Sequence, residues 1–284
     1  MNKSSLVLFD KIISTAEEQK TLPWLNGFVA EGLPYNYSTG RHYNGQNVVM
    51  LWMGGAFNRS GWMTYKQAIA LGGQVRKGEH GLPIIYARQN HFEEDEETGE
   101  KKLVLGTVKW YTVFNVSQID GLKEISHEPA NNLKAEVFLS RIPAVMVQGR
   151  FPRYDAVNDI INIPYPSDFE EENGYYSTTF HELIHWTANK VDRKVNEEGI
   201  GRMYEELVAE LGSALLRGEF RVGKPPYIPD VEQYVTEWIQ TLKANPDMLF
   251  KAMKDAEKAV GYLLEITKDE KDMQTIEQPL LIEA

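Results

Sequence analysis

The sequence contains no cysteine among its 284 residues. This absence excludes disulfide bonds, thiolate nucleophiles and every cysteine-based zinc site. Histidine is also scarce, with six in the chain, so any metal site needs carboxylates to complete it. No apolar run approaches the ~18 residues that a membrane span needs, and the first residues lack the features of a signal peptide. We therefore expect a soluble, cytoplasmic protein that does not enter a membrane.

The net charge of −11 is unevenly distributed along the chain. Residues 1–126 carry 13 basic and 13 acidic residues, whereas residues 127–284 carry 17 and 28. Within the first half, residues 33–90 hold six basic residues against one acidic residue. A polar segment with glycine and proline, residues 121–132, is typical of a linker. The sequence therefore predicts two domains with different partners, residues 1–126 and residues 127–284.

The pattern of apolar residues predicts an α+β fold in both halves. Residues 4–20 carry an apolar stripe at helical spacing. Two β-rich runs, residues 83–92 and 102–116, flank the acidic segment EEDEETGEK, which is typical of an exposed hairpin turn. The first half is therefore predicted to combine helices with a β-hairpin.

The second half predicts a small sheet followed by helices. Apolar runs at residues 144–148 and 157–163 favour strands, and two prolines end that sheet. Helices are predicted over about residues 175–190 and 203–220, and two further helices are predicted after the Pro-Asp pairs at 229 and 246.

The segment His181-Glu182-Leu183-Ile184-His185 lies in the first of these helices. Histidines four residues apart share one helix face, so both imidazoles can reach a single metal ion. Glu182, on the neighbouring face, is then placed to act as the general base of a metallopeptidase. The alternative is a helix that has one buried and one exposed histidine.

Two histidines do not complete a zinc site, which uses three protein ligands and one open position. The next helix offers carboxylates in the segment YEELVAEL, residues 204–211. We predict Glu206 as the third ligand, and Glu210 as the acceptor of a hydrogen bond from the far nitrogen of a ligating histidine. Glu205 is the alternative ligand if the helix is rotated by one position, although it also suits a solvated helix face.

Such a site predicts a peptidase that uses one Zn2+ ion. Zinc lowers the pKa of its bound water to ~7, and Glu182 takes the proton as the water attacks a peptide carbonyl. The strand predicted over residues 157–163 could pair with an extended peptide substrate. The identity of the peptide or protein substrate is not predicted.

The basic stretch at residues 33–90 is also rich in aromatic residues, a combination typical of single-stranded DNA binding. Aromatic rings stack on bases and cations neutralise phosphates, but aromatic cores with basic loops have the same composition. The predicted DNA-binding residues combine loop tyrosines with nearby cations: Tyr35, Tyr37, Arg41, Tyr43, Lys66, Arg76 and Lys77.

Several blocks of the sequence resemble plasmid antirestriction proteins of the ArdC type. In the second half these are YYSTTFHELIHWTANKVDRK and MYEELVAELGSALL, which resemble a zincin-like metallopeptidase domain. In the first half LPYNYSTGRHYNGQNVVML, WMTYKQAIALGGQVRKGEHGLPIIY and YTVFNVSQIDGL resemble the single-stranded-DNA-binding domain of the same proteins. The resemblance implies zinc, binding of single-stranded DNA and protection of incoming DNA from restriction. The alternative function is a non-catalytic DNA-binding or masking protein with a structural zinc site.

Overall fold

The computed structural model describes residues 3–26, 32–53, 57, 59–87, 91–94, 101–104, 108–123, 132–169, 172–193, 198–222 and 228–268. The chain divides into two compact units, and each unit consists of one long segment and one shorter segment from later in the sequence. The first unit comprises Met1–Glu128 with Val231–Asp247, and the second comprises Pro129–Asp230 with Met248–Ala284.

The first unit combines helices with a four-stranded sheet of order β1-β2-β7-β4. Its helices are α1 (Lys3–Gln19), α2 (Pro23–Asn26), α3 (Gln46–Met53), α4 (Tyr65–Ala70), η1 (Val116–Gln118) and α8 (Val231–Ala244). Its strands are β1 (Tyr35–Asn36), β2 (Gly61–Thr64), β3 (Gln74–Val75), β4 (Leu82–Ala87), β5 (His91–Glu94), β6 (Lys101–Val104), β7 (Val108–Asn115) and β8 (Ile119–Asp120).

The predicted β-hairpin is confirmed by the pairing of its strands. β4 runs antiparallel to β7, and β5 runs antiparallel to β6. Residues 95–100, where the turn was predicted, lie outside the described residues, as do residues 124–131 of the predicted linker. The β4–β7 pair carries Ile84 and Val113 into a core shared with Leu51 of α3 and Trp62 of β2.

Helix α8 packs within the first unit although it follows the second half of the chain in sequence. The ring of Trp24 is fully buried, lies edge-on to Trp238 with 5.5 Å between centroids, and donates from Nε1 to the Tyr234 hydroxyl at 3.1 Å. A division at residue 126 stays a prediction, and the sequence pattern did not indicate that residues 231–247 join the first unit.

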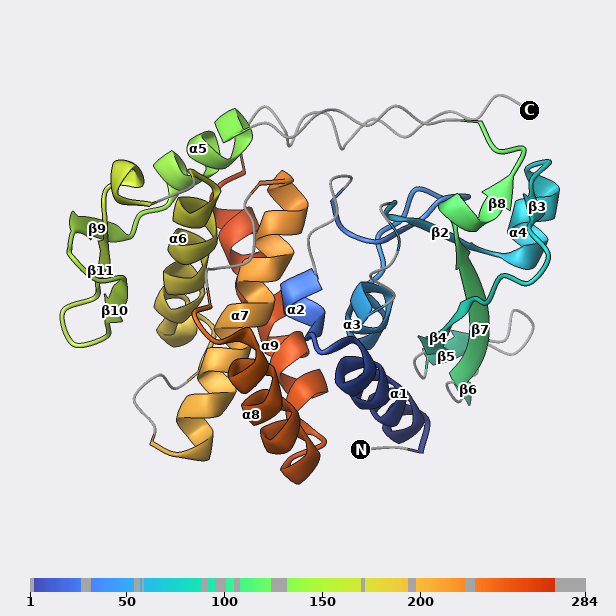
Figure 1. The fold of residues 1–284 in the computed structure, drawn as a ribbon. Helices are drawn as coiled ribbons and strands as arrows, with labels where there is room; N and C mark the ends of the chain where they lie inside the picture. Colours follow the sequence, from blue (N-terminus) through green and yellow to red (C-terminus); the bar gives the residue numbers. More distant parts are fainter. Residues whose placement is uncertain are drawn as a thin grey trace. The chain divides into compact units, whose positions relative to one another are not determined.

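The second unit places a three-stranded sheet against a group of helices (Figure 1). Its helices are α5 (Asn132–Arg141), η2 (Pro166–Asp168), α6 (Glu172–Trp186), η3 (Ala188–Lys190), α7 (Ile200–Phe220) and α9 (Met248–Ile266). Its strands are β9 (Val145–Gln148), β10 (Arg153–Asp155) and β11 (Ile160–Ile163). In Figure 1 the strands lie beside α6, with α7 and α9 beyond it.

Helices α6 and α7 approach each other closely because α7 presents glycine at the crossing. A Cβ atom on Gly212 would lie 2.7 Å from side-chain carbons of Ile184, so only glycine fits without a shift. Further along, Phe180 of α6 and Phe220 of α7 pack with Phe138 of α5. This packing fixes the rotation of α7 relative to α6, and hence which of its glutamates faces the histidine pair.

The strand order corrects one prediction. Residues 157–163 were predicted to form a strand that pairs with a substrate, but β11 is the central strand, between β10 and β9. Both of its edges are occupied, so the prediction of substrate pairing at this strand is wrong. The described edge strand near α6 is β10. Within the described part of the chain, no helix is long and apolar enough to cross a membrane.

Candidate metal centre

The two histidines of α6 point to the same place. Their Nε2 atoms are 3.1 Å apart, and their ring planes are inclined at 76°. The two rings meet because residues four apart lie on the same face of a helix. Leu183 and Ile184, between them in sequence, are buried and lie on the face that packs into the core. The alternative of one buried and one outward-facing histidine does not describe this helix.

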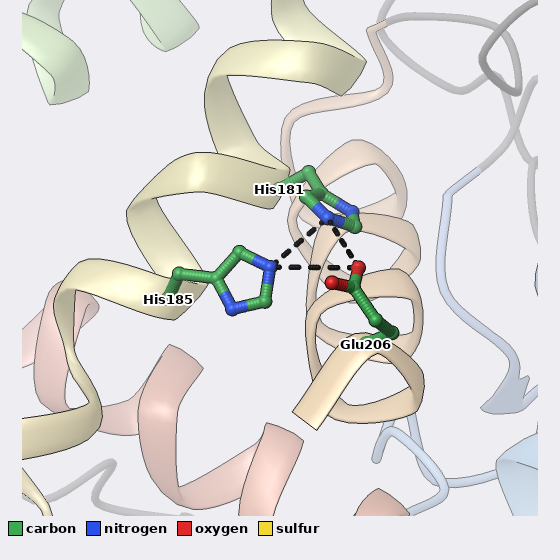
Figure 2. Close-up of side chains that lie close together, drawn as sticks. All are labelled: His181, His185 and Glu206. Carbon is green, nitrogen blue, oxygen red and sulfur yellow. Dashed lines mark hydrogen bonds and ion pairs between the residues drawn. The ribbon is translucent and has the colours of Figure 1, made fainter. Parts of the chain in front are cut away.

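Glu206 of α7 completes the group from the facing helix. Its Oε2 atom is 3.4 Å from His181 Nε2 and 3.7 Å from His185 Nε2. Figure 2 shows the three side chains converging from α6 and α7. The structure therefore brings together the three predicted ligands, and they are the one group of potential metal ligands found among the described residues.

The distances fit a divalent cation. Zinc binds histidine nitrogen and carboxylate oxygen at ~2.0–2.1 Å with tetrahedral angles, so two ligand atoms should be about 3.4 Å apart. The three observed separations, 3.1, 3.4 and 3.7 Å, bracket that value. His181, His185 and Glu206 would hold the ion, and a fourth position would stay open for water or substrate.

Glu205 occupies the place behind His185 that was predicted for Glu210. His185 Nδ1 lies 3.1 Å from Glu205 Oε1, so a protonated Nδ1 donates to this carboxylate and fixes the ring with Nε2 directed toward Glu206. For His185 the prediction of Glu210 is thus wrong, as is the reading of Glu205 as a solvated residue, because Glu205 is only 3% exposed. Glu210 lies further along α7, where its charge partly offsets the burial that lowers the pKa of Arg217 to about 10.

Arg193, in the connection between α6 and α7, holds Glu205 in place. Its Nε and Nη2 atoms donate to the two carboxylate oxygens at 3.1 and 3.0 Å, and both side chains are 4% exposed. The same guanidinium donates to Thr187 Oγ1 and to the carbonyl of Ile184, at the end of α6. Sequence reasoning missed Arg193, because a lone arginine in a connecting segment follows no periodic pattern.

Glu182 is anchored by the neighbouring sheet. The backbone N–H of Tyr154 in β10 donates to Glu182 Oε2 at 2.7 Å, and the glutamate is 8% exposed. This bond occupies one carboxylate oxygen and leaves Oε1 as the atom that can accept a proton. Glu182 lines the same cleft of about 1000 Å3 as the three clustered side chains.

The clustered charges act strongly on one another. Hydrogen bonds from His181 and His185 hold the pKa of Glu206 well below its usual range. Burial alone would lower the pKa of His185, but its bonds to Glu205 and Glu206 outweigh burial and raise that pKa to about 9. The pocket thus concentrates negative charge around two imidazoles, as expected for a site that binds a cation.

Comparison with known proteins places this geometry in a family. The model of the N-terminal domain of anti-restriction factor ArdC matches residues 5–114, and the model of zincin-like metallopeptidases matches residues 133–255. The metal-free crystal structure of the antirestriction protein ArdC from plasmid R388 is 33% identical, with a TM-score of 0.73 over 94% of this chain and 98% of that one. The chain belongs to the ArdC family of antirestriction proteins. The Mn(II)-bound structure of the same R388 protein is 31% identical, with a TM-score of 0.72 over 95% of this chain and all of that one.

The resemblance to ArdC and the α+β fold class are therefore confirmed. Membership of the family and the Mn(II)-bound relative support metal binding by the second unit. Among curated proteins, a DNA primase TraC from Escherichia coli is 35% identical over 94% of this chain. The chain spans only 27% of the length of that primase, and 19% of a second TraC that is also 35% identical.

The predicted DNA-binding residues differ in their exposure. Arg41, Lys66 and Lys77 are exposed. Arg76 is also exposed, but it donates to Glu79, Asp120 and the carbonyl of Ser117.

The three tyrosines of this set are packed rather than presented to solvent. The ring of Tyr35 is 9% exposed, so its prediction as a stacking platform is wrong. Tyr37 is half-buried and donates to the carbonyl of Lys123, and burial raises the pKa of the half-buried Tyr43. Among the residues of this unit whose exposure the structure describes, the exposed aromatic rings lie instead on β4, β7 and α4: Tyr86, Trp110, Tyr111 and Tyr65.

Proposed function

We propose that this antirestriction protein carries a zinc-dependent peptidase site in its second unit and binds single-stranded DNA through its first. The observation that carries the peptidase proposal is the convergence of His181, His185 and Glu206 beside an anchored Glu182. A His-His-Glu set with one open position is the donor set of catalytic zinc sites. Zinc held there would supply Lewis-acid activation of water and of the scissile carbonyl.

The residues of the chain then divide the remaining work. Glu182 Oε1 takes the proton from the attacking water as the new C–O bond forms, and it returns a proton to the leaving nitrogen as the C–N bond breaks. The N–H of Tyr154 keeps the carboxylate oriented throughout. Glu205 keeps His185 in one tautomer and orientation, so that Nε2 of His185 stays directed at the metal position.

Replacing Glu182 with glutamine tests catalysis apart from metal binding. We expect Glu182→Gln to bind zinc with unchanged affinity and to lose hydrolysis of a general protein substrate by at least ~100-fold, the contribution of a general base. Glu219→Gln, an exposed glutamate near the end of the same α7 helix, serves as the control. Full protection of a transferred plasmid by Glu182→Gln would contradict a catalytic role in antirestriction and favour masking of DNA.

DNA binding by the first unit is supported by its exposed cations and rings. Tyr86 and Tyr111, on adjacent strands, lie edge-to-face with 6.4 Å between centroids. Lys109 is directly opposite Tyr86 in the strand register. We propose that Tyr86 and Tyr111 stack on bases, at ~1–3 kcal/mol per base, and that Arg41, Lys66 and Lys77 contact phosphates.

A titration with oligothymidylate at several salt concentrations tests this interface. Neutralising one phosphate-contacting lysine should reduce the slope of log affinity against log salt by about 0.7. Tyr86→Ala and Tyr111→Ala should each weaken binding roughly five- to 150-fold, whereas Tyr65→Ala, an exposed ring on α4, is the control. Absence of binding at low salt would remove the DNA proposal and leave the peptidase proposal intact.

A further inference from the structure

The cleft beside the candidate metal centre has a cationic rim that the peptidase chemistry does not require. Arg150 and Arg153, on the connection into β10 and on β10 itself, line the cleft that contains His181 and Glu182. Arg202, in the first turn of α7, lines the same cleft. All three arginines are exposed.

These arginines are not committed to carboxylates of the chain. Among residues whose positions the structure describes, none of the three forms an ion pair, whereas the buried Arg193 in the same region pairs with Glu205. Hydrogen bonds from Asn158 and Val157 lower the pKa of Asp155, and the charge of nearby Arg153 adds to this effect without an ion pair. The rim therefore offers guanidinium groups to a ligand.

The rim charge opposes the charge of its surroundings. Residues 127–284 carry 28 acidic and 17 basic residues. The acidic residues that line the cleft have partners of their own, since Arg193 holds Glu205, the histidines hold Glu206 and the N–H of Tyr154 holds Glu182. A concentration of free cations at the mouth of a cleft in an acidic unit selects a negatively charged ligand.

Phe151 adds an apolar contact at the same rim. Its ring is 70% exposed and lies 5.3 Å from the Arg150 guanidinium, and it lines the cleft. One exposed ring is too few for the successive stacking of bases that single-stranded DNA uses. Strand β10 is an edge strand close to Glu182, and its main-chain groups other than the Tyr154 N–H, which Glu182 uses, remain for an extended peptide.

We propose that the cleft recognises an extended peptide segment that carries acidic side chains next to an apolar one, with Arg150, Arg153 and Arg202 as the recognition residues. This inference deepens the proposed peptidase function and rests on it for the use of the bound segment. Recognition is measured by peptide binding and not by cleavage, so the recognition proposal and the peptidase proposal can fail separately.

Fluorescence anisotropy of the full chain, loaded with zinc and carrying Glu182→Gln to prevent cleavage, tests the proposal. The probes are three labelled dodecapeptides that share one central phenylalanine and differ in four flanking residues, which are glutamate, glutamine or lysine. We expect the glutamate peptide to bind at least ten times tighter than the lysine peptide at low salt, and the difference to shrink as salt rises. Each of Arg150→Gln, Arg153→Gln and Arg202→Gln should weaken its binding about two- to fivefold. Lys254→Gln, an exposed cation on α9 outside the cleft, should leave it unchanged.

Equal binding of the three peptides, or a triple arginine variant that keeps the preference, would overturn the proposal. The proposal would also be overturned if the triple arginine variant lost affinity for oligothymidylate but not for the glutamate peptide, because the arginines would then bind phosphate groups and not carboxylates. Unchanged melting temperatures exclude unfolding as the cause. If the glutamate peptide binds as expected but the unmodified chain never cleaves it, the peptidase proposal fails and the recognition proposal stands.

Discussion

Replacing Arg193 with methionine separates the stability of the second unit from its affinity for metal. The guanidinium makes four hydrogen bonds in a site where it and Glu205 are each 4% exposed. Removing one partner of such a pair leaves a buried, uncompensated charge and costs about 3–5 kcal/mol. For a unit of this size, the melting temperature of the metal-free protein should fall by about 6–20 °C.

The same substitution should weaken zinc binding by about 10–100-fold, because Glu205 loses the anchor that orients it toward His185. The double variant Arg193→Met/Glu205→Met distinguishes the two effects. Removing both charges should restore most of the lost stability, since apolar residues often replace a buried ion pair without loss. Zinc affinity should stay low, because His185 Nδ1 has lost its acceptor.

Calorimetric unfolding of the metal-free protein and zinc titration are the two assays. Lys268→Met is the control, because it removes an exposed ion pair with Glu265 on the same unit and should cost less than ~1 kcal/mol. The reasoning is refuted if Arg193→Met melts like the unmodified protein, or if the double variant recovers its zinc affinity along with its stability.

Three further predictions concern packing, capping and metal. Gly212→Ala should lower the free energy of unfolding by about 1–3 kcal/mol and weaken zinc binding, because the new Cβ would lie 2.7 Å from Ile184. The control is Gly261→Ala on α9, where a Cβ meets open space and should not destabilise the protein. Equal shifts in the melting temperatures of the two variants would contradict this prediction. Thr64→Ala removes the capping box with Gln67 at the start of α4 and should cost ~1 kcal/mol in chemical denaturation, whereas Thr64→Ser should be nearly neutral. Adding a chelator to protein held at zinc 100 times above its Kd should remove about 2.7 kcal/mol of stability, and a melting curve that does not move would argue against a bound ion.

The local features of the site were predictable because they depend on helical spacing alone. His181, Glu182 and His185 follow from one turn of helix, and a carboxylate on the next helix follows from the lack of cysteine. Choosing between Glu205 and Glu206 was harder, since adjacent positions differ by about 100° around a helix. That choice depends on where Gly212 meets Ile184, which is a contact between helices and not a property of either segment.

Features that depend on spatial neighbours were not predictable. The apolar run at residues 157–163 indicated a strand but not its place in the order β10-β11-β9, so its use by substrate was predicted wrongly. The loop around Tyr35 has the composition of an exposed surface, yet parallel pairing of β1 with β2 buries that ring. Arg193 was missed for the same reason, because its importance lies in contacts with Glu205 and the end of α6.

Every side chain that would clasp the cation, together with the brace behind it, lies between residues 181 and 206, within one helical hairpin. The tether of Glu182 comes instead from the sheet, at Tyr154. A displacement of β10 would therefore free the Glu182 carboxylate, yet it would leave His181, His185 and Glu206 in place, because none of them depends on the sheet for its position.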